Sequence, residues 1–284
     1  MIEVVAPGPL ATVQDLGRPG HAGIGVGVSG AADRGALRLA NRLVGNPEGA
    51  AGIETTFGGL VLRPERDVTV AVTGADGPIT VDGRAEPVNT VLRVRAGALL
   101  RLGTPARGLR GYVAVRGGIA VEPVLGSRAT DVLSGLGPPR LAAGTRLPVG
   151  PAPREFPVID QAPVRARDGQ LVLDVVPGPR ADWFTDYALA ALLGAEFEVS
   201  AEIDRVGMRL DGPELTRCRD DELPSEGMAL GSLQVPPSGR PTLFLADHPV
   251  TGGYPVIAVL LAAEVDRAAQ ARPGQRIRFR RTER

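Results

Sequence analysis

Residues 14–34 read QDLGRPGHAGIGVGVSGAADR and place a serine, two arginines and two aspartates among closely spaced glycines. Three kinds of chemistry suit this composition. The segment GVSGA around Ser29 nearly matches the G-x-S-x-G turn, which exposes a nucleophilic serine between a strand, here residues 25–28, and a helix. Glycine-rich turns before a helix also bind phosphate or carboxylate groups, with Arg18 or Arg34 supplying the positive charge. The third interpretation is structural: Ser29 caps the helix by accepting a hydrogen bond from a backbone N–H.

Two other segments carry polar side chains on glycine-rich turns. Arg116-Gly117-Gly118 ends an expected strand, and an arginine fork beside glycine N–H groups can hold a carboxylate; the alternative is a solvated arginine. Between residues 225 and 255, Glu226, Gln234 and Asp247 are suited to orient a small polar substrate or to act as a base. The alternative there is turn chemistry with a glutamate bonded to backbone N–H groups. Spacing alone assembles no complete catalytic set.

The composition excludes several functions. The chain contains no lysine, so it has no lysine for a Schiff base, for a Walker-type phosphate site or for a Ser-Ser-Lys amidase triad, and it carries no covalent biotin. Two histidines lie far from the single cysteine, Cys218, so we expect no metal site. A formal net charge of +0 gives no electrostatic reason to bind nucleic acid or a membrane. One cysteine, no signal-peptide pattern and no long apolar run lead us to expect a cytoplasmic protein.

The composition also indicates the fold class. Glycine (38) and proline (26) are abundant, and only 4% of the residues are aromatic. Chain breakers at this density favour short strands over long helices, so we expect an all-β protein with a few short helices. Apolar runs between turns predict strands at 68–73, 79–82, 90–95, 98–102, 111–116, 170–176, 230–235, 241–245, 255–260 and 276–280. Alternation in several of these runs indicates antiparallel strands with one face toward solvent. Helices are expected from Ser29 to about Val44, ended by Gly45, and over 180–193 and 264–270.

Three short segments recur in the same order and at nearly the same offset. Residues 95–102 (RAGALLRL) match 272–279 (RPGQRIRF), VTG at 72–74 matches VTG at 250–252, and Glu54-x4-Gly59 matches Glu226-x4-Gly231. This pattern indicates an internal duplication. We expect two similar β-rich domains, residues 1–155 and 156–284, joined in the proline-rich stretch 148–163.

Considered together, these segments resemble the biotin-dependent carboxyltransferase family, also called the allophanate hydrolase subunit 2 family, which includes the C subunit of 5-oxoprolinase and the Kip antagonist. Each match is short, but the matches run in order over nearly the whole chain. The first half carries QD-x-GR-x-G from Gln14, SGA-x-D from Ser29, AN-x-LVGN from Ala40, Glu54, TGA from Thr73, VRGG from Val115 and GS-x-x-T from Gly126. The second half carries DR-x-G-x-RL from Asp204, SEG from Ser225, GS-x-QVP from Gly231, TGGYP from Thr251 and Q-x-x-PG from Gln270.

The resemblance implies two cyclophilin-like β-barrel domains and a role as one part of a heteromeric enzyme. With an allophanate hydrolase subunit 1-like partner (the B subunit of 5-oxoprolinase) and the TIM-like A subunit, such proteins form an ATP-dependent 5-oxoprolinase that opens 5-oxo-L-proline to L-glutamate. We expect this chain to be such a subunit, inactive alone, with ATP bound by it or shared with its partners. Two alternatives stay open: half of a biotin-dependent carboxyltransferase acting on urea or a similar amide, and a regulator that binds a kinase-inhibitor protein.

The matched motifs and the polar turns together select the site residues. We expect Glu226, Asp247 and Arg116 to be catalytic. The expected substrate- or anion-binding residues are Gln14, Asp15, Arg18, Ser29, Asp33, Asn41, Glu54, Gly117, Gly118, Ser127, Gln234, Thr251, Gly253 and Tyr254. Such a lysine-free site suits a subunit that positions a substrate or a phosphorylated or carboxylated intermediate, with arginines neutralising the charge.

Overall fold

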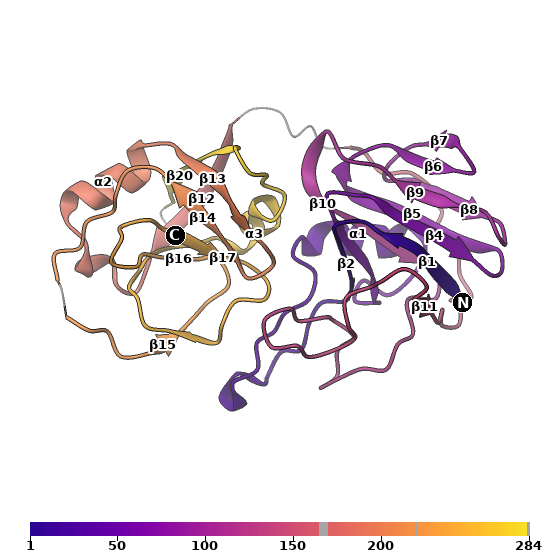
Figure 1. The fold of residues 1–284 in the computed structure, drawn as a ribbon, viewed down its shortest axis with the longest axis horizontal. Helices are drawn as coiled ribbons and strands as arrows, with labels where there is room; N and C mark the ends of the chain where they lie inside the picture. The colour runs from indigo at the N-terminus through magenta and orange to yellow at the C-terminus, as the bar shows by residue number, and fades with distance from the viewer. Residues whose placement is uncertain (165–169, 220, 283–284) are drawn as a thin grey trace. The chain divides into compact units, whose positions relative to one another are not determined.

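A computed structural model describes residues 1–164, 170–219 and 221–282, and strands dominate the chain (Figure 1). The expected all-β class is therefore confirmed. The chain forms two compact units. Unit 1 comprises Met1–Arg18, Ser29–Asp131 and Gly135–Arg167, and unit 2 comprises Pro19–Val28, Val132–Ser134 and Asp168–Arg284. Short pieces of the first half of the sequence thus belong to unit 2. The expected domain bounds, residues 1–155 and 156–284, stay a prediction.

Two antiparallel sheets enclose one core in unit 1. The first sheet has the order β11-β1-β4-β9-β6-β7, formed by β1 (Ile2–Pro7), β4 (Leu60–Pro64), β6 (Ile79–Val81), β7 (Arg84–Glu86), β9 (Leu100–Leu102) and β11 (Arg146–Leu147). The second has the order β2-β3-β10-β5-β8, formed by β2 (Leu10–Gln14), β3 (Gly52–Thr56), β5 (Val68–Asp76), β8 (Val91–Val94) and β10 (Arg107–Val115). Side chains from both sheets, among them Val4, Leu62, Ile53 and Val113, pack into a single cluster.

Helix α1 (Arg34–Leu43) covers the other face of β5 and β10. Ala40 and Leu43 of the helix pack with Ala71 of β5 and Ala114 of β10. Because both of its faces are covered, β10 is buried continuously over residues 109–115 instead of alternating. Polar side chains on this strand are therefore forced into the interior, where they need partners.

The start of α1 differs from the expectation. Asp33 is the N-cap, and its Oδ1 accepts a hydrogen bond from Ala36 N at 2.8 Å, so the prediction that Ser29 caps the helix is wrong. Ser29 lies at a φ of 54°, in the left-handed region, and the chain turns through the following residues before the helix begins. Residues 25–28 contain no strand, so the strand required by the nucleophile turn is absent from this described segment.

Unit 2 contains a closed barrel with the order β12-β19-β16-β17-β14-β13-β20. Its strands are β12 (Leu171–Pro177), β13 (Phe197–Ile203), β14 (Gly207–Asp211), β16 (Ser232–Gln234), β17 (Thr242–Phe244), β19 (Val256–Leu260) and β20 (Arg276–Arg281). The pair β12–β20 is parallel, and the other neighbours are antiparallel. In unit 2, the rings of Phe197 and Phe279 pack in a tilted arrangement, with centroids 5.8 Å apart and an interplanar angle of 55°, in a core that also holds Trp183.

Short helices and one small sheet complete unit 2. The 3-10 turn η2 (Ala181–Trp183) leads into α2 (Asp186–Gly194), which Thr185 caps, and α3 (Ala262–Ala268) follows β19. The two-residue strands β15 (Glu226–Gly227) and β18 (Thr251–Gly252) pair outside the barrel. The 3-10 turn η1 (Ala22–Ile24) lies in the part of the first half that belongs to unit 2.

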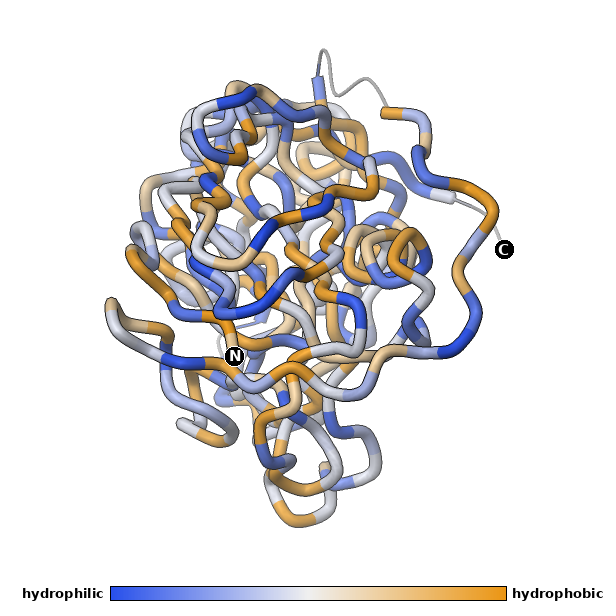
Figure 2. Tube along the Cα trace, turned by 90° about the vertical axis from the view of Figure 1, so that its right-hand side faces the viewer, coloured by the Kyte–Doolittle hydropathy of each residue, from blue (hydrophilic) through white to orange (hydrophobic). Residues whose placement is uncertain are grey.

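Each strand predicted from the sequence has a counterpart. Figure 2 shows that hydrophilic and hydrophobic residues alternate over short distances along the chain. Helices α2 and α3 fall within their predicted ranges, apart from one or two terminal residues. Gly45, at a φ of 72°, follows α1 as predicted. Strands β1 to β4, β7, β11, β13, β14, β15 and β18 were not predicted, and charged and polar positions in several of them weaken the apolar pattern.

One of the three recurring segments forms the same local structure twice. Gly97 and Gly274 have φ values of 79° and 80°, and the residue after each donates its N–H to the carbonyl three positions earlier, at 3.1 and 3.0 Å. Strands β9 and β20 follow these turns. The other matched segments lie in strands of different length and pairing, β5 against β18 and β3 against β15. The internal duplication stays a prediction.

Candidate functional site

The end of β2 lies beside a loop formed by residues 124–130. Thr130 N donates to Val13 O at 2.9 Å and joins the two backbones. Five predicted site residues gather at this contact, together with Thr130. We call these six residues the buried polar cluster, since every member is at most 8% exposed: Gln14, Asp15, Arg18, Ser29, Ser127 and Thr130.

Asp15 holds the two segments of the cluster together. Its Oδ1 accepts hydrogen bonds from Gly17 N at 2.8 Å and Ser127 Oγ at 2.6 Å, and its Oδ2 accepts one from Arg128 N at 2.6 Å. Its carbonyl oxygen accepts a bond from Ala31 N at 2.8 Å. Because both carboxylate oxygens are occupied, Asp15 is built to position the loop.

Gln14 and Arg18 bind consecutive carbonyl groups of the loop. Gln14 Nε2 donates to Thr130 O at 2.8 Å. Arg18 Nη2 donates to Ala129 O, and its Nε donates to Val124 O at 3.4 Å. Among the described residues, Gln14 Oε1 and Arg18 Nη1 are buried and have no hydrogen-bond partner. The cluster therefore presents one unused acceptor and one unused cationic donor.

Ser29 lies beside this cluster in a tight backbone turn. Its Oγ is 3.5 Å from Thr130 O, the limit of a hydrogen bond. A Cβ on the next residue, Gly30, would lie 2.6 Å from Gly17 N, and Gly30 has a φ of 91°. The glycine is needed because the backbones of Gly30 and Gly17 approach closely. The S-G-A motif thus shapes the turn that closes the cluster.

Glu54 is the centre of a second buried hydrogen-bond network, which binds the backbone just before α1. Its Oε2 accepts hydrogen bonds from Tyr112 Oη at 2.8 Å and Ala32 N at 3.0 Å, while Arg110 Nε lies 3.8 Å from Oε1. Tyr112 Oη in turn accepts a bond from Asp33 N at 2.8 Å. Burial, with the nearby carboxylates of Glu54 and Asp33, raises the pKa of Tyr112 well above its usual value, so the phenol stays neutral.

Asn41 and Gly117 belong to a hydrogen-bond network at the C-terminal end of α1. Asn41 Nδ2 donates to Ala50 O at 2.7 Å, and its Oδ1 accepts from Asn46 Nδ2 at 3.1 Å. Asn46 Oδ1 accepts the N–H of Gly117 at 2.8 Å, and Gly118 N donates to a carbonyl of β10 at 2.7 Å. Both glycine N–H groups are therefore engaged within the protein.

Arg116 is surrounded by backbone carbonyls. Its guanidinium donates to Val44 O at 2.6 Å, Pro153 O at 2.7 Å and Glu155 O at 2.6 Å. It also lies over the ring of Phe156, 4.3 Å from the centroid. This arrangement fastens the proline-rich stretch to the C-terminal end of α1, and the catalytic role of Arg116 stays a prediction.

In unit 2, Glu226 forms an ion pair with Arg180. Arg180 Nε lies 2.9 and 3.0 Å from the two carboxylate oxygens, and Nη2 also donates to Oε1. The hydrogen bonds and charge of Arg180 hold the pKa of Glu226 below its usual value. A carboxylate stabilised in this way is a weak general base, so the pair is better suited to orient a ligand than to remove a proton.

The other predicted residues of unit 2 lie around this pair. Glu226 of β15 is registered with Gly252 of β18, next to Thr251 and the exposed Gly253. Gln234 Nε2 donates to Tyr254 O at 3.0 Å, so the buried amide supports the exposed turn.

Asp247 lies apart from that group, in a buried ion pair. Arg205 Nε and Nη2 donate to its two carboxylate oxygens, each at 2.9 Å, and Val132 N donates to Oδ2 at 2.9 Å. The side chains of Asp247 and Arg205 are 0% and 1% exposed. The bonds from Arg205 and Val132 and full burial make this carboxylate a structural anchor of unit 2, and its catalytic role stays a prediction.

The structure thus sorts the predicted residues into separate groups. Three of these groups each unite several predicted residues: the buried polar cluster, the Glu54 network with Asp33, and, in unit 2, the Glu226 turn. Asp247 and Arg116 lie in structural contacts. Sequence reasoning missed the partners Arg110, Tyr112, Arg180, Arg205 and Thr130. Arg205 and Thr130 lie in quoted motifs, but Arg110, Tyr112 and Arg180 carry no local signal that distinguishes them from other strand and turn residues.

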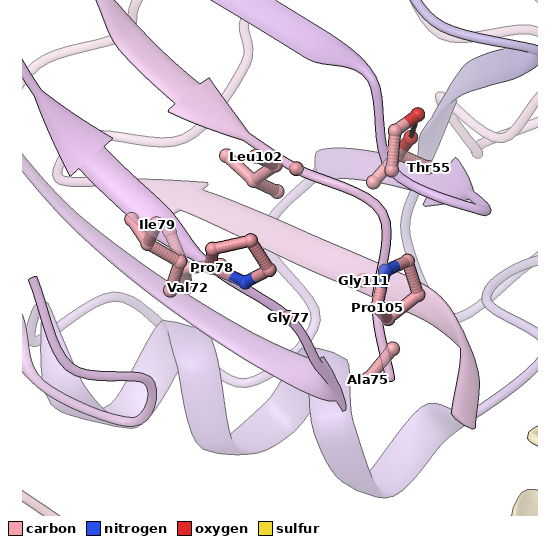
Figure 3. Close-up of a pocket in the computed structure, with 11 residues that line it drawn as sticks. Thr55, Val72, Ala75, Gly77, Pro78, Ile79, Leu102, Pro105 and Gly111 are labelled. Carbon is pink, nitrogen blue, oxygen red and sulfur yellow. Dashed lines mark hydrogen bonds between the residues drawn. The ribbon is translucent and has the colours of Figure 1, made fainter. Parts of the chain in front are cut away.

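Unit 1 also contains a small apolar pocket, which Figure 3 shows. It is lined by Thr55, Gly58, Val72, Ala75, Gly77, Pro78, Ile79, Leu102, Gly103, Pro105 and Gly111. The Thr55 hydroxyl donates to Gly58 O at 3.3 Å, and no predicted site residue lines the pocket. Within the described ranges, no group of three His, Cys, Asp or Glu side chains could hold a metal ion. None of the described helices is long and apolar enough to cross a membrane.

Known proteins resemble this chain over nearly its full length. The family described as carboxyltransferase domain, subdomain A and B, matches residues 24–281. The C subunit of 5-oxoprolinase from Escherichia coli (strain K12) is 37% identical over 282 residues, which are 98% of this chain and 90% of that protein. The crystal structure of TTHA0988 is 37% identical with a TM-score of 0.88, covering 98% of this chain and 55% of that one. The K. lactis urea amidolyase structure is 30% identical with a TM-score of 0.92, covering 98% of this chain and 18% of that one.

The chain thus spans about half the length of one solved relative, 55%, and nearly all of the E. coli protein. The expected resemblance to biotin-dependent carboxyltransferases and to the C subunit of 5-oxoprolinase is confirmed. Since the family match covers residues 24–281 and the E. coli relative is 37% identical, this chain belongs to the family of the carboxyltransferase domain, subdomain A and B.

Proposed function

We propose that this chain is a subunit of an ATP-dependent 5-oxoprolinase, which cleaves 5-oxo-L-proline to L-glutamate. The observation that carries the proposal is the 37% identity to the C subunit of E. coli 5-oxoprolinase, over 98% of this chain and 90% of the relative. The proposed setting is the cytoplasm, where ATP is supplied.

The state of the carboxylates supports a subunit that is inactive alone. Asp15, Glu54, Glu226 and Asp247 are each held by arginine, hydroxyl or backbone donors. Carboxylates whose oxygens are engaged by fixed donors are suited to orient neighbouring groups. We propose that the reacting groups are completed by two partners, one like the B subunit of 5-oxoprolinase (allophanate hydrolase subunit 1-like) and one like its TIM-like A subunit.

The hydrogen-bond donors of the turn at residues 116–118 bear on where ATP binds. A phosphate cradle needs cationic side chains and unoccupied backbone N–H groups. The N–H of Gly117 is bonded to Asn46, that of Gly118 to a β10 carbonyl, and the Arg116 guanidinium to three carbonyls. We therefore propose that ATP binds on a partner or with partner residues, rather than at this turn alone.

A second candidate is half of a biotin-dependent carboxyltransferase that acts on urea or a similar amide. The observation that favours it is the similarity to K. lactis urea amidolyase, at a TM-score of 0.92 and 30% identity. Because this chain has no lysine, biotin would have to reside on another protein.

The test is an assay of the chain alone, with each partner, and with both partners, for ATP-dependent release of glutamate from 5-oxoproline. We expect turnover only in the full mixture with ATP. The same chain is offered urea, ATP, bicarbonate and a biotin carboxylase with its biotin carrier. Carboxylation of urea without glutamate release would reject the first proposal in favour of the second.

Alanine variants map the proposed site in the active mixture. Glu226→Ala and Arg116→Ala are expected to lose turnover while they keep the fold, as their positions on glycine-rich turns predict. The matched control is Arg240→Ala, which breaks an exposed ion pair with Asp211 in unit 2. Wild-type rates in both test variants would remove these two residues from the site.

A further inference from the structure

Three arginines are among the largest fully buried side chains of the protein: Arg18, Arg110 and Arg205. Arg110 lies 3.8 Å from the carboxylate of Glu54, and Arg205 bonds Asp247 at 2.9 Å. Arg18 has no such carboxylate among the described residues, and its Nη1 has no hydrogen-bond partner there. An uncompensated guanidinium in the interior is costly, because it has lost its water and gained no counter-charge. Arg18 is thus the exception that requires an explanation.

The hydrogen bonds that Arg18 and Gln14 already form fix the directions in which Arg18 Nη1 and Gln14 Oε1 point. Arg18 donates from Nη2 to Ala129 O and from Nε to Val124 O, so its fork cannot rotate without breaking both bonds. Gln14 Nε2 donates to Thr130 O at 2.8 Å. Because a carbonyl only accepts, the amide cannot be flipped, and Oε1 is the unused end. Both side chains leave the same short segment and anchor on consecutive carbonyls.

We propose that Arg18 Nη1 and Gln14 Oε1 form a recognition subsite for a small carboxylate with an N–H on the carbon next to the acid. Arg18 binds the carboxylate and supplies its counter-charge, and Gln14 accepts the N–H. 5-Oxoproline has this arrangement, because its ring N–H and its carboxylate share one carbon; the choice of this ligand rests on the proposed function. Both side chains are at most 1% exposed and are hydrogen-bonded to carbonyls of residues 124–130, so entry of the ligand requires this loop to move.

The first experiment measures binding of four probes to the full chain, alone and in the assembled complex, by titration calorimetry. The probes are 5-oxoproline, cyclopentanecarboxylate (no N–H), 2-pyrrolidinone (no carboxylate) and N-methyl-5-oxoproline (N–H blocked). We expect 5-oxoproline to bind at least about tenfold more tightly than each of the others, as loss of a buried hydrogen bond to a charged or polar group predicts. Equal affinity for 5-oxoproline and its N-methyl form overturns the role of Gln14, and no binding in either setting overturns the subsite.

The second experiment uses matched arginine variants. Arg18→Lys keeps the charge but loses the planar fork, so we expect 5-oxoproline binding to weaken by at least about tenfold. Arg128→Lys is the control, since the Arg128 side chain also donates to a backbone carbonyl near the loop, Val121 O at 2.6 Å, but has no part in the subsite. Circular dichroism and the melting temperature of each variant establish that it is folded. Unchanged binding in folded Arg18→Lys overturns the proposal.

A crystal grown with 5-oxoproline separates a ligand subsite from a buried water. Density for the ligand carboxylate on Arg18 supports the proposal, whereas a single ordered water on Nη1 and Oε1 overturns it. Failure here is distinguishable from failure of the proposed function. Turnover of 5-oxoproline with an unchanged KM in Arg18→Lys keeps the function and rejects the subsite. Selective binding of 5-oxoproline without turnover in any mixture keeps the subsite and rejects the function.

Discussion

Replacing Asp247 with asparagine tests whether this carboxylate is a base or half of a structural ion pair. Its oxygens accept hydrogen bonds at 2.9 Å from Arg205 Nε, Arg205 Nη2 and Val132 N. Removal of one partner from a buried pair costs about 3–5 kcal/mol, because the other charge stays buried without compensation. Native proteins are stable by only about 5–15 kcal/mol, so unit 2 should lose a large part of its stability.

The assay is urea unfolding followed by the fluorescence of Trp183. This is the only tryptophan of the chain, and it is 6% exposed in the core of unit 2, so it reports on the unit that holds the pair. With a slope of roughly 2 kcal/mol per molar urea, the midpoint should fall by about 1.5–2.5 M. The control is Asp211→Asn, whose pair with Arg240 is 49% and 43% exposed. Loss of an exposed pair costs at most about 1 kcal/mol, so the control midpoint should move by about 0.5 M or less.

A double-mutant cycle isolates the pair itself. Arg205→Met should cost less in the Asp247→Asn background than in the wild type, because the lone buried charge is then removed. The reasoning is refuted by an Asp247→Asn variant that keeps the wild-type midpoint yet abolishes turnover in the assembled enzyme. That result would instead assign Asp247 to the chemistry.

Three further outcomes are expected. Burial and neighbouring carboxylates raise the pKa of Tyr112 in the folded protein. The neutral phenol therefore stabilises the fold below about pH 10, the pKa of an unfolded tyrosine, and this stabilisation is lost as the pH rises through the folded pKa. Tyr112→Phe should therefore cost about 1–3 kcal/mol at neutral pH and flatten the alkaline decline in urea midpoints; an unchanged decline contradicts this. Arg180→Ala should return the lowered pKa of Glu226 toward its usual value in a carbon-13 NMR titration. The pair's stabilisation is present above the unfolded pKa, near 4.5, and is lost as pH falls through the folded pKa; an unshifted titration would reject the pairing. A Cβ on Gly117, which has a φ of 101°, would overlap a backbone carbonyl oxygen, whereas a Cβ on Gly126 would meet nothing within 4 Å. Gly117→Ala should therefore lower the melting temperature more than Gly126→Ala. Equal losses would contradict the close contact.

Local patterns were sufficient to predict much of the secondary structure. Each predicted strand exists, because alternation and glycine-rich turns act over a few neighbouring residues. The N-cap of α1 was assigned to Ser29 and is Asp33, because both residues have suitable side chains and the choice depends on the path of the preceding loop. That path is set by hydrogen bonds to distant elements, such as Ala32 N to Glu54 and Asp33 N to Tyr112.

The sequence by itself determined the all-β class, the absence of lysine chemistry and the motif residues of the candidate site. Only the tertiary structure decided which of these residues face one another. Arg18 meets carbonyls more than 100 positions away, and Asp247 meets Arg205 across 42 positions. Residue type fixes what a side chain can donate or accept, but a contact between distant segments depends on how whole sheets pack. The sequence could therefore name Arg18 as a binding residue, while only the folded chain showed that its charge is buried without a carboxylate partner among the described residues.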